Sequence, residues 1–373
     1  MLFRSTTIGK LKLRNRFVRS ATFDGMAKKD GRVSDDQIAL YTRLARGGVG
    51  LVVTGMASVH PSGQISGYQN TVHDDRCIAG LQRLAAAVHR RGAKVALQLA
   101  HAGREAFKYL AHKHATALAP SVVPDAPCGE AACRAMTDEE IEDIVRAFGD
   151  GARRAREAKF DAVQIHGAHA YLFSQFLSPF SNRRNDRWGG SLENRMRFLS
   201  AVYRAVRTAV GADFPVMIKL GVADGFPHGL QFEEGCRAAV ECAGWGFDAL
   251  EISQGLRGEH YSQTEFRTAI DRPEREAYFR DWCREVKARV AVPVMMVGGL
   301  RRLEQMEAFL RDGEADFMAL CRPLIREPDL IERWAGGELK EPDCISCNAC
   351  FNALLELQPL ACAIRVRSER KPS

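Results

Sequence analysis

The chain has no apolar run long enough to cross a lipid bilayer, which takes about 20 consecutive apolar residues in a helix. Its N-terminal sequence, MLFRSTTIGKLKLRNR, also lacks the apolar stretch of a secretory signal peptide. We therefore expect no membrane-spanning segment and a cytoplasmic location.

The chain also lacks a concentrated patch of one charge. Lysine and arginine outnumber aspartate and glutamate by 53 to 46, a net charge of +7, but the basic residues are spread along the whole sequence. Nucleic-acid-binding surfaces need basic residues gathered on one face, so we expect no nucleic-acid partner. A diffuse positive field still suits a small ligand that carries phosphate.

No internal repeat is visible, and no Gly-x-Gly-x-x-Gly motif opens a βαβ unit, which argues against a Rossmann domain. Short apolar and β-branched runs alternate instead with amphipathic segments of helical periodicity, such as 138–159 and 194–210. Eight such alternations favour a single α/β fold, a (β/α)8 TIM barrel, over a doubly wound sheet. The predicted strands are Phe17–Val18, Val49–Thr54, Lys94–Leu99, Ala162–Ile165, Val216–Leu220, Ala249–Ile252, Val292–Val297 and Phe317–Leu320.

In such a barrel the active site lies at the C-terminal ends of the strands. Gln98 and Lys219 stand inside predicted strands, where a polar side chain is costly unless it is used. They are functional candidates, although an ordinary polar pair in the barrel interior is the alternative. Other polar residues follow strand ends: Ser20, Thr22, Asp24, His101, Arg104, Gln254 and His260.

The densest polar group follows the fourth predicted strand and consists of His166, His169 and Tyr171. A single histidine near a strand end is more often a satisfied core residue. Three such groups within six residues favour a site that holds a carbonyl oxygen with two N–H donors and delivers a proton from the phenol.

The segment that starts at His166, HGAHAYLFSQFLSPFSNRRNDRWGGSLENRMRF, resembles the Old Yellow Enzyme family of flavin-dependent ene-reductases. That family has HxxHxY followed by FLSPxSNxRxDxYGGSxENRxRF, and Trp188 here stands at the usual tyrosine. The resemblance implies FMN as cofactor and reduction of the C=C bond of an enone or an enoyl or dienoyl thioester. His166 and His169 would bond the carbonyl oxygen, the flavin N5 would give a hydride, and Tyr171 would protonate the α-carbon.

A phosphate site is expected where Gly298 and Gly299 follow the seventh strand and Arg322 follows the eighth, since these loops form the usual phosphate cradle of the fold. The resemblance implies further cofactor contacts. Lys219 would lie near the flavin N1 and O2, where the family commonly has arginine, and Phe23 replaces a potential-tuning cysteine of some branches. The remaining implied FMN-binding residues are Ala21, Thr22, Gly55, Gln98 and Cys321.

Four of the eleven cysteines crowd the last thirty residues: Cys344, Cys347, Cys350 and Cys362. A CxxCxxC run with a distant fourth cysteine suits a [4Fe–4S] cluster. Structural zinc, which more often uses two separated pairs, and unligated thiols are the alternatives. The sequence CISCNAC resembles the tail motif of the iron–sulfur branch of the family, which contains 2,4-dienoyl-CoA reductase and trimethylamine dehydrogenase. We expect a barrel over residues 1–335 and a cysteine-rich extension over 336–373.

Enzymes of that branch continue into dinucleotide-binding domains that this sequence does not contain, so we expect NAD(P)H or an outside protein as electron donor. Reduction of an activated C=C bond is our first interpretation. The second is a flavin and iron–sulfur dehydrogenase that oxidises an amine or another small molecule and passes electrons to a partner protein. A non-catalytic electron-transfer subunit is the third. The sequence leaves open whether the chain forms a homo-oligomer.

Overall fold

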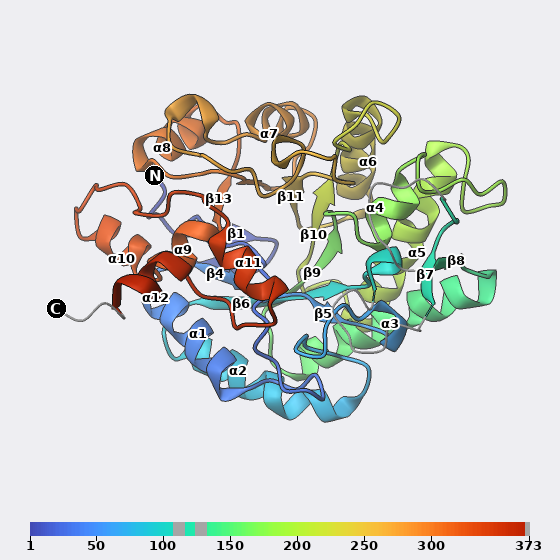
Figure 1. Cartoon of the computed structure of the whole chain (residues 1–373), viewed down its shortest axis with the longest axis horizontal. Helices are drawn as coiled ribbons and strands as arrows, with labels where there is room; N and C mark the ends of the chain where they lie inside the picture. The colour runs from blue at the N-terminus through green and yellow to red at the C-terminus, as the bar shows by residue number, and fades with distance from the viewer. Residues whose placement is uncertain (107–115, 124–132, 370–373) are drawn as a thin grey trace.

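The computed structural model describes residues 1–106, 116–123 and 133–369. A ring of helices surrounds a central set of strands, and the last helices of the chain lie across the strands in the view of Figure 1. Within the described residues, no helix has both the length and the apolar composition needed to cross a bilayer.

Eight parallel strands close into a barrel because the last of them pairs with the first. All eight predicted strands are confirmed, and their ends differ from the prediction by at most two residues. In barrel order they are β3 (Phe17–Arg19), β4 (Leu51–Val53), β6 (Lys94–Ala100), β9 (Ala162–Gly167), β10 (Val216–Gly221), β11 (Ala249–Ser253), β12 (Val294–Val297) and β13 (Phe317–Leu320).

The helices of the outer ring follow the strands in sequence. Two of them begin with a capping box. In each, the side chain of the N-cap residue accepts a hydrogen bond from the backbone N–H of the third helical residue, whose side chain accepts one from the N-cap backbone N–H. The pairs are Ser34 with Gln37 and Thr137 with Glu140. The ring consists of α1 (Asp35–Arg46), α2 (Ile78–His89), α3 (Asp138–Glu157), α5 (Leu192–Val210), α6 (Phe232–Trp245), α7 (Arg280–Lys287), α8 (Leu303–Arg311), α9 (Arg322–Arg326) and α10 (Leu330–Ala335).

Smaller elements complete the described part of the chain. The hairpin of β1 (Thr6–Ile8) and β2 (Leu11–Leu13) buries Ile8 and Leu13 against apolar side chains of the barrel strands. The other short elements are β5 (Ala57–Ser58), β7 (Ala117–Ala119), β8 (Cys133–Ala135), α4 (Leu172–Leu177) and the 3₁₀ turns Pro61–Gly63, Asp75–Cys77, Gly103–Glu105, Tyr261–Gln263 and Pro273–Arg275.

A long connection runs from Ala100, at the end of β6, to Thr137, the N-cap of α3. Its described parts pair as β7 with β8, and residues 107–115 and 124–132 lie outside the described residues. The cysteine-rich tail contains α11 (Ala349–Leu355) and α12 (Ala363–Glu369). The tail contacts the loop after β3, because the Leu360 N–H donates to the Asp24 carbonyl oxygen at 2.9 Å.

One layer of the barrel interior is polar. Lys219 stands opposite Glu251 in the pairing of β10 with β11, and Gln98 stands opposite Gln164 in the pairing of β6 with β9. All four side chains are buried. Because buried polar groups are costly unless they are paired, this layer marks where the barrel changes from core to site.

Candidate active site

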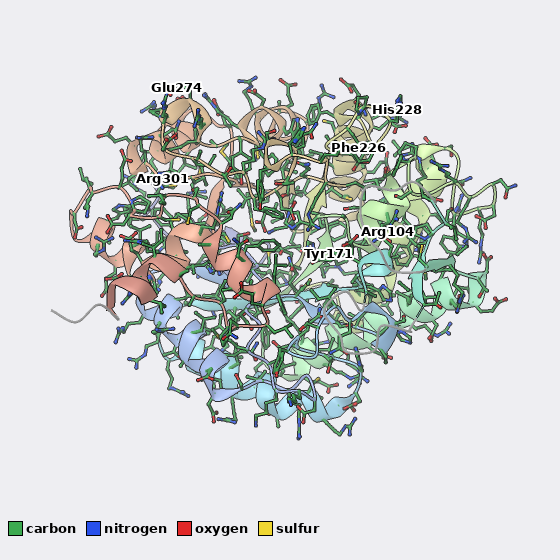
Figure 2. All side chains as sticks on the ribbon, in the orientation of Figure 1. Arg104, Tyr171, Phe226, His228, Glu274 and Arg301 are labelled. Carbon is green, nitrogen blue, oxygen red and sulfur yellow. The ribbon has the colours of Figure 1, made fainter. Side chains whose placement is uncertain are left out.

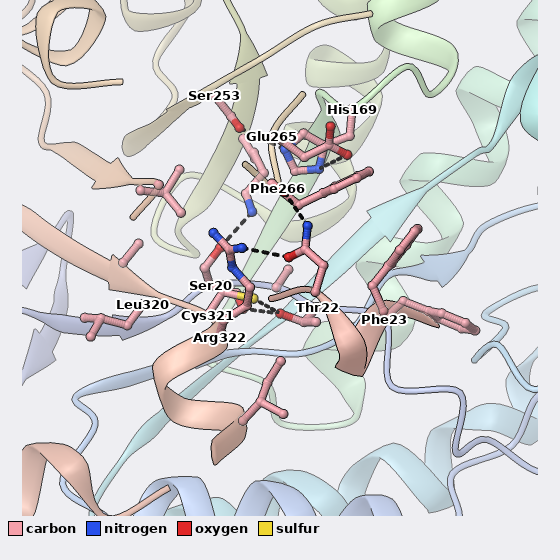
Figure 3. Close-up of a pocket in the computed structure, with 18 of the residues that line it drawn as sticks. Ser20, Thr22, Phe23, His169, Ser253, Glu265, Phe266, Leu320, Cys321 and Arg322 are labelled. Carbon is pink, nitrogen blue, oxygen red and sulfur yellow. Dashed lines mark hydrogen bonds and ion pairs between the residues drawn. The ribbon is translucent and has the colours of Figure 1, made fainter. Parts of the chain in front are cut away.

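A cavity of about 230 Å³ lies at the C-terminal ends of the barrel strands. Figure 3 shows the side chains that converge on it, and Figure 2 places Tyr171 near the centre of the molecule while His228 lies at its periphery. The cavity brings together all but one of the predicted catalytic and flavin-binding residues: Ala21, Thr22, Phe23, Gln98, His166, His169, Tyr171, Lys219, Gly298, Gly299, Cys321 and Arg322.

A tight turn after β9 gathers His166, His169 and Tyr171. His169 and Ala170 both have left-handed backbones, with φ of 63° and 65°, which is a strained conformation for residues with a side chain. The turn is held because their N–H groups donate to the carbonyl oxygens of Gln254 and Gly255 at 2.9 and 3.0 Å. As a result, the His166 ring centroid lies 5.1 Å from that of His169 and 4.9 Å from that of Tyr171.

Both imidazoles are electrically neutral at physiological pH. Burial lowers the pKa of His166 and of His169 well below the ordinary value, and the positive charges of Lys219 and Arg257 act in the same direction. His169 Nε2 lies 2.8 Å from the Ser253 hydroxyl. His166 Nδ1 is buried and has no hydrogen-bond partner within the described part of the chain, so it is available to a ligand.

A chain of hydrogen bonds runs through the polar layer below the cavity. The Gln98 amide donates to Gln164 at 2.8 Å, and Gln164 donates to Glu251 at 2.8 Å. Sequence reasoning missed Glu251, although the signal was present. The argument that a charged side chain inside a strand is costly, which identified Lys219, applies equally to the acid in the run Ala249–Ser253.

The glycines of the predicted phosphate site have backbones that only glycine adopts easily. Gly298 and Gly299 have φ of 104° and 76°. A Cβ on Gly298 would lie 2.6 Å from the Tyr278 ring, so a side chain there would collide with it. Arg322 is fixed nearby, because it donates to the Arg267 carbonyl oxygen and to the Asn348 side chain, both at 2.7 Å.

Arg257, Glu265 and Phe266 also line the cavity, and sequence reasoning did not identify them. The Arg257 guanidinium makes a two-pronged ion pair with Glu265, with the closest contact at 2.6 Å. It also lies 5.5 Å from the centre of the Phe266 ring. The three residues belong to the loop after β11, whose sequence has no regular spacing from which such contacts could be predicted.

The cysteine-rich tail covers part of the cavity. Phe351 and Leu354 of α11 are among the lining residues, and Phe351 stacks on Phe266 with ring centroids 4.8 Å apart. A second, smaller cavity lies beside it, with Arg322 in the wall of both. Its lining includes all four tail cysteines: Cys344, Cys347, Cys350 and Cys362.

The tail meets only one of two requirements for a metal site: its four thiols line one cavity, but they are not arranged as a set of ligands. Across residues 1–106, 116–123 and 133–369, no group of three or more His, Cys, Asp or Glu side chains is arranged to hold a metal ion. The four thiols face one small space, but their geometry is not that of a closed ligand set.

Gly55 is the one predicted flavin-binding residue outside the lining of the cavity. Its N–H donates to the Tyr41 hydroxyl at 2.8 Å, and Tyr41 donates to Asp24 at 2.7 Å. A Cβ on Gly55 would lie 2.8 Å from the Thr22 carbonyl oxygen. Gly55 thus allows the close approach of the loop that carries Ala21, Thr22 and Phe23.

Other polar residues at strand ends also lie outside the lining. His101 is buried, its Nε2 lies 3.0 Å from the Ser62 hydroxyl, and burial lowers its pKa to about 3. His260 is exposed at the start of a 3₁₀ turn. Asp24, Arg104 and Gln254 are absent from the lining as well.

The most distinctive stretch of the sequence, after Tyr171, serves as a scaffold. Asn182 donates to the carbonyl oxygens of Phe176 and Trp188, both at 2.7 Å. The buried Trp188 donates from its indole N–H to Asp138 at 2.9 Å. Arg195 donates to the Leu177 carbonyl oxygen and pairs with Glu234 at 2.7 Å. These bonds fix the segment after the turn that carries Tyr171 to α3 and α6.

Comparison with known proteins agrees with this geometry. A model of the NADH:flavin oxidoreductase / NADH oxidase family matches residues 1–341. The chain is 37% identical over 350 residues to the NADH oxidase of Thermoanaerobacter brockii, an alignment that covers 93% of this chain and 52% of that protein. The chain therefore spans about half the length of this relative.

Solved structures give the same result. A complex of 2-naphthoyl-CoA reductase with 2-naphthoyl-CoA superposes with a TM-score of 0.89 at 27% identity, covering all of this chain and 58% of that one. Morphinone reductase in complex with tetrahydroNAD superposes with a TM-score of 0.76 at 28% identity, covering 92% of this chain and 93% of that one.

Proposed function

The chain belongs to the NADH:flavin oxidoreductase / NADH oxidase family, and we propose that it uses FMN to reduce the C=C bond of an enone or an enoyl or dienoyl thioester. One observation carries the proposal. The group of His166, His169 and Tyr171 and the phosphate-type group of Gly298, Gly299 and Arg322 line the same cavity. Similarity to morphinone reductase and to 2-naphthoyl-CoA reductase supports the reductive direction and the thioester class.

The cavity suits FMN. Gly298 and Gly299 have no side chains to block their backbone N–H groups, and Arg322 lines the same cavity. Backbone N–H groups and an arginine at the ends of barrel strands are typical of a phosphate site. Gln98 and Lys219 line the same space and offer an amide and a positive charge to a flavin pyrimidine ring. Ala21, Thr22 and Phe23 would lie against one edge of the ring system, and Cys321 beside Thr22, whose hydroxyl is 3.0 Å from the thiol.

When bound in its reduced form, FMN would supply a hydride to the substrate. The residues of the chain would do the rest of the chemistry. His166 and His169, held neutral by burial, would donate N–H bonds to the substrate carbonyl oxygen and stabilise the negative charge that develops there. Tyr171 would then give the proton from its hydroxyl to the α-carbon.

The charge of the cavity supports a carbonyl substrate over a cationic amine. Its lining includes four Lys or Arg residues and two Glu residues, an excess of two positive charges, and the Arg257 guanidinium already covers the face of Phe266. A cation therefore already occupies the aromatic face that a substrate amine would need, whereas the two histidines and Tyr171 in the same lining suit a carbonyl oxygen. The dehydrogenase interpretation therefore ranks second.

We further propose that the extension over 336–373 holds a [4Fe–4S] cluster with Cys344, Cys347, Cys350 and Cys362. The common cavity of the four thiols supports this, since a cluster of this type takes four thiolate ligands. Electrons would come from NAD(P)H or from a protein donor.

The test follows reoxidation of the reduced flavin. Protein prepared without oxygen and reduced with dithionite is mixed with 2-cyclohexenone or crotonyl-CoA, while flavin absorbance and the saturated product are measured. We expect reoxidation with stoichiometric formation of the saturated product. His166→Ala combined with His169→Ala should abolish it, since the carbonyl oxygen loses both donors.

His260→Ala is the matched control, because His260 is exposed and lies outside the cavity lining. It should react like the wild type. Reoxidation that survives the double histidine substitution would move the carbonyl site elsewhere. If neither unsaturated compound reoxidises the flavin and an amine instead reduces oxidised protein, the dehydrogenase interpretation replaces ours.

A further inference from the structure

A buried acid lies directly behind the lysine of the flavin cavity. Lys219 Nζ is 3.1 Å from Glu251 Oε1, and the two residues stand side by side in the pairing of β10 with β11. Ser20 joins them, since its hydroxyl accepts from Lys219 at 2.8 Å and donates to Glu251 at 2.6 Å. Glu251 is completely buried and Lys219 is 2% exposed.

The two charges differ in their access to the cavity. Lys219 and Ser20 are among the lining residues and Glu251 is not, so the carboxylate lies one layer deeper. Its second oxygen accepts from Gln164 at 2.8 Å, and Gln164 in turn accepts from Gln98, which lines the cavity. Glu251 is thus tied to three lining residues without touching a ligand.

From this arrangement we propose that Glu251 is a positioning residue that sets the reduction potential of the bound flavin by partly neutralising Lys219. The proposal rests on the function proposed above, in which Lys219 lies beside the flavin pyrimidine ring. A cation there favours the reduced flavin, because reduction adds negative charge to that ring. A carboxylate 3.1 Å from the cation opposes this effect and holds the ammonium group in one place.

The burial of both side chains makes the opposing charge effective. Both side chains are shielded from water, so the field of Glu251 is screened much less than that of a surface acid. A structural role is the competing explanation. Removal of one partner of a buried ion pair strongly destabilises a protein, which would affect folding whatever the flavin does. The measured quantity must therefore be the potential, not stability alone.

The experiment measures the FMN midpoint potential of wild type, Glu251→Gln, Lys219→Met and the double variant by anaerobic titration against reference dyes. Glu251→Gln should raise the midpoint, since it leaves the charge of Lys219 unopposed. Lys219→Met should lower it, since it leaves a buried carboxylate near the flavin. The double variant should fall between the two single variants. Glu314→Gln is the matched control, because Glu314 is also buried and paired, with Arg280, but lies outside the cavity lining.

Each outcome is decisive. A midpoint in Glu251→Gln that stays at the wild-type value or falls would overturn the inference. If Glu251→Gln does not fold, the comparison passes to the other two variants, where the double variant must have a higher midpoint than Lys219→Met. The FMN content, measured from the absorption spectrum, distinguishes failure of the proposed function from failure of the role proposed for Glu251. Wild-type protein that does not bind FMN would refute the proposed function, whereas bound FMN with an unresponsive midpoint refutes only the role of Glu251.

Discussion

The Arg322 guanidinium donates a hydrogen bond to the Asn348 side chain at 2.7 Å, and this bond joins the cysteine-rich tail to the proposed phosphate site. Asn348 has a left-handed backbone, with φ of 58°, and its amide also donates to the Phe266 carbonyl oxygen at 2.6 Å. The tail therefore helps to hold an arginine of the barrel in position, and the two parts of the chain share one site.

Removal of this bond should loosen FMN. Asn348→Ala leaves Arg322 with fewer fixed partners, so its charge is less well placed for the phosphate. A hydrogen bond of this kind contributes about 0.5–1.5 kcal/mol, which corresponds to a roughly 2- to 10-fold weaker FMN affinity. Recovery of FMN fluorescence on dilution measures it. Asn352→Ala, an exposed asparagine on the same helix, is the control, and equal FMN affinity in the two variants would contradict the role of Asn348.

Tyr171→Phe should separate the two halves of the reaction. Reduction of the flavin by its donor needs no proton from Tyr171 and should keep its rate. Reoxidation by a weakly activated enone should slow by about 10²- to 10⁴-fold, the usual contribution of a general acid. Stopped-flow absorbance measures the two steps separately. An unchanged rate of reoxidation would assign the proton to another group.

The sequence predicted most of the fold and the cavity because strands and clustered polar side chains carry local signals. Buried runs such as Phe317–Leu320 matched the strands of the barrel, and the spacing of His166, His169 and Tyr171 predicted their convergence. Contacts that depend on loop conformation could not be predicted in this way. Arg257 meets Glu265 only because the loop after β11 folds back, and Asn348 meets Arg322 across 26 positions of sequence.

Binding of an uncharged enone to the oxidised protein should be insensitive to pH between about 8 and 5.5. Burial lowers the pKa of His166 and His169 well below 6.5, so neither imidazole gains a proton as the pH falls through that value. Both keep the neutral form that donates one N–H bond. Histidines with an ordinary pKa would become charged near pH 6.5 and change the dissociation constant there.

Flavin difference spectra at a series of pH values give the dissociation constant. An inflection near pH 6.5 in the wild type would show that at least one of the two imidazoles titrates normally. His260→Ala again serves as the control, since an exposed histidine should not influence enone binding.

The last prediction concerns metal in the tail. If Cys344, Cys347, Cys350 and Cys362 hold a [4Fe–4S] cluster, protein prepared without oxygen should contain about four irons per chain. Cys347→Ala should lose the iron, because it removes one of four ligands. It should keep FMN when the cofactor is in excess, since Gly298 and Gly299 of the phosphate site lie outside the tail. Elemental analysis and the absorption spectrum give both contents.

Cys133→Ala provides the control, because Cys133 belongs to β8 and not to the small cavity that the tail cysteines line. It should keep both iron and FMN. Zinc in place of iron would identify the tail as a structural zinc site. The absence of any metal would leave a flavin enzyme without a second redox centre. In that last case NAD(P)H should reduce the flavin directly, and removal of Cys347 should not change the rate. A rate that falls in Cys347→Ala, but not in Cys133→Ala, would instead place the tail on the path of the electrons.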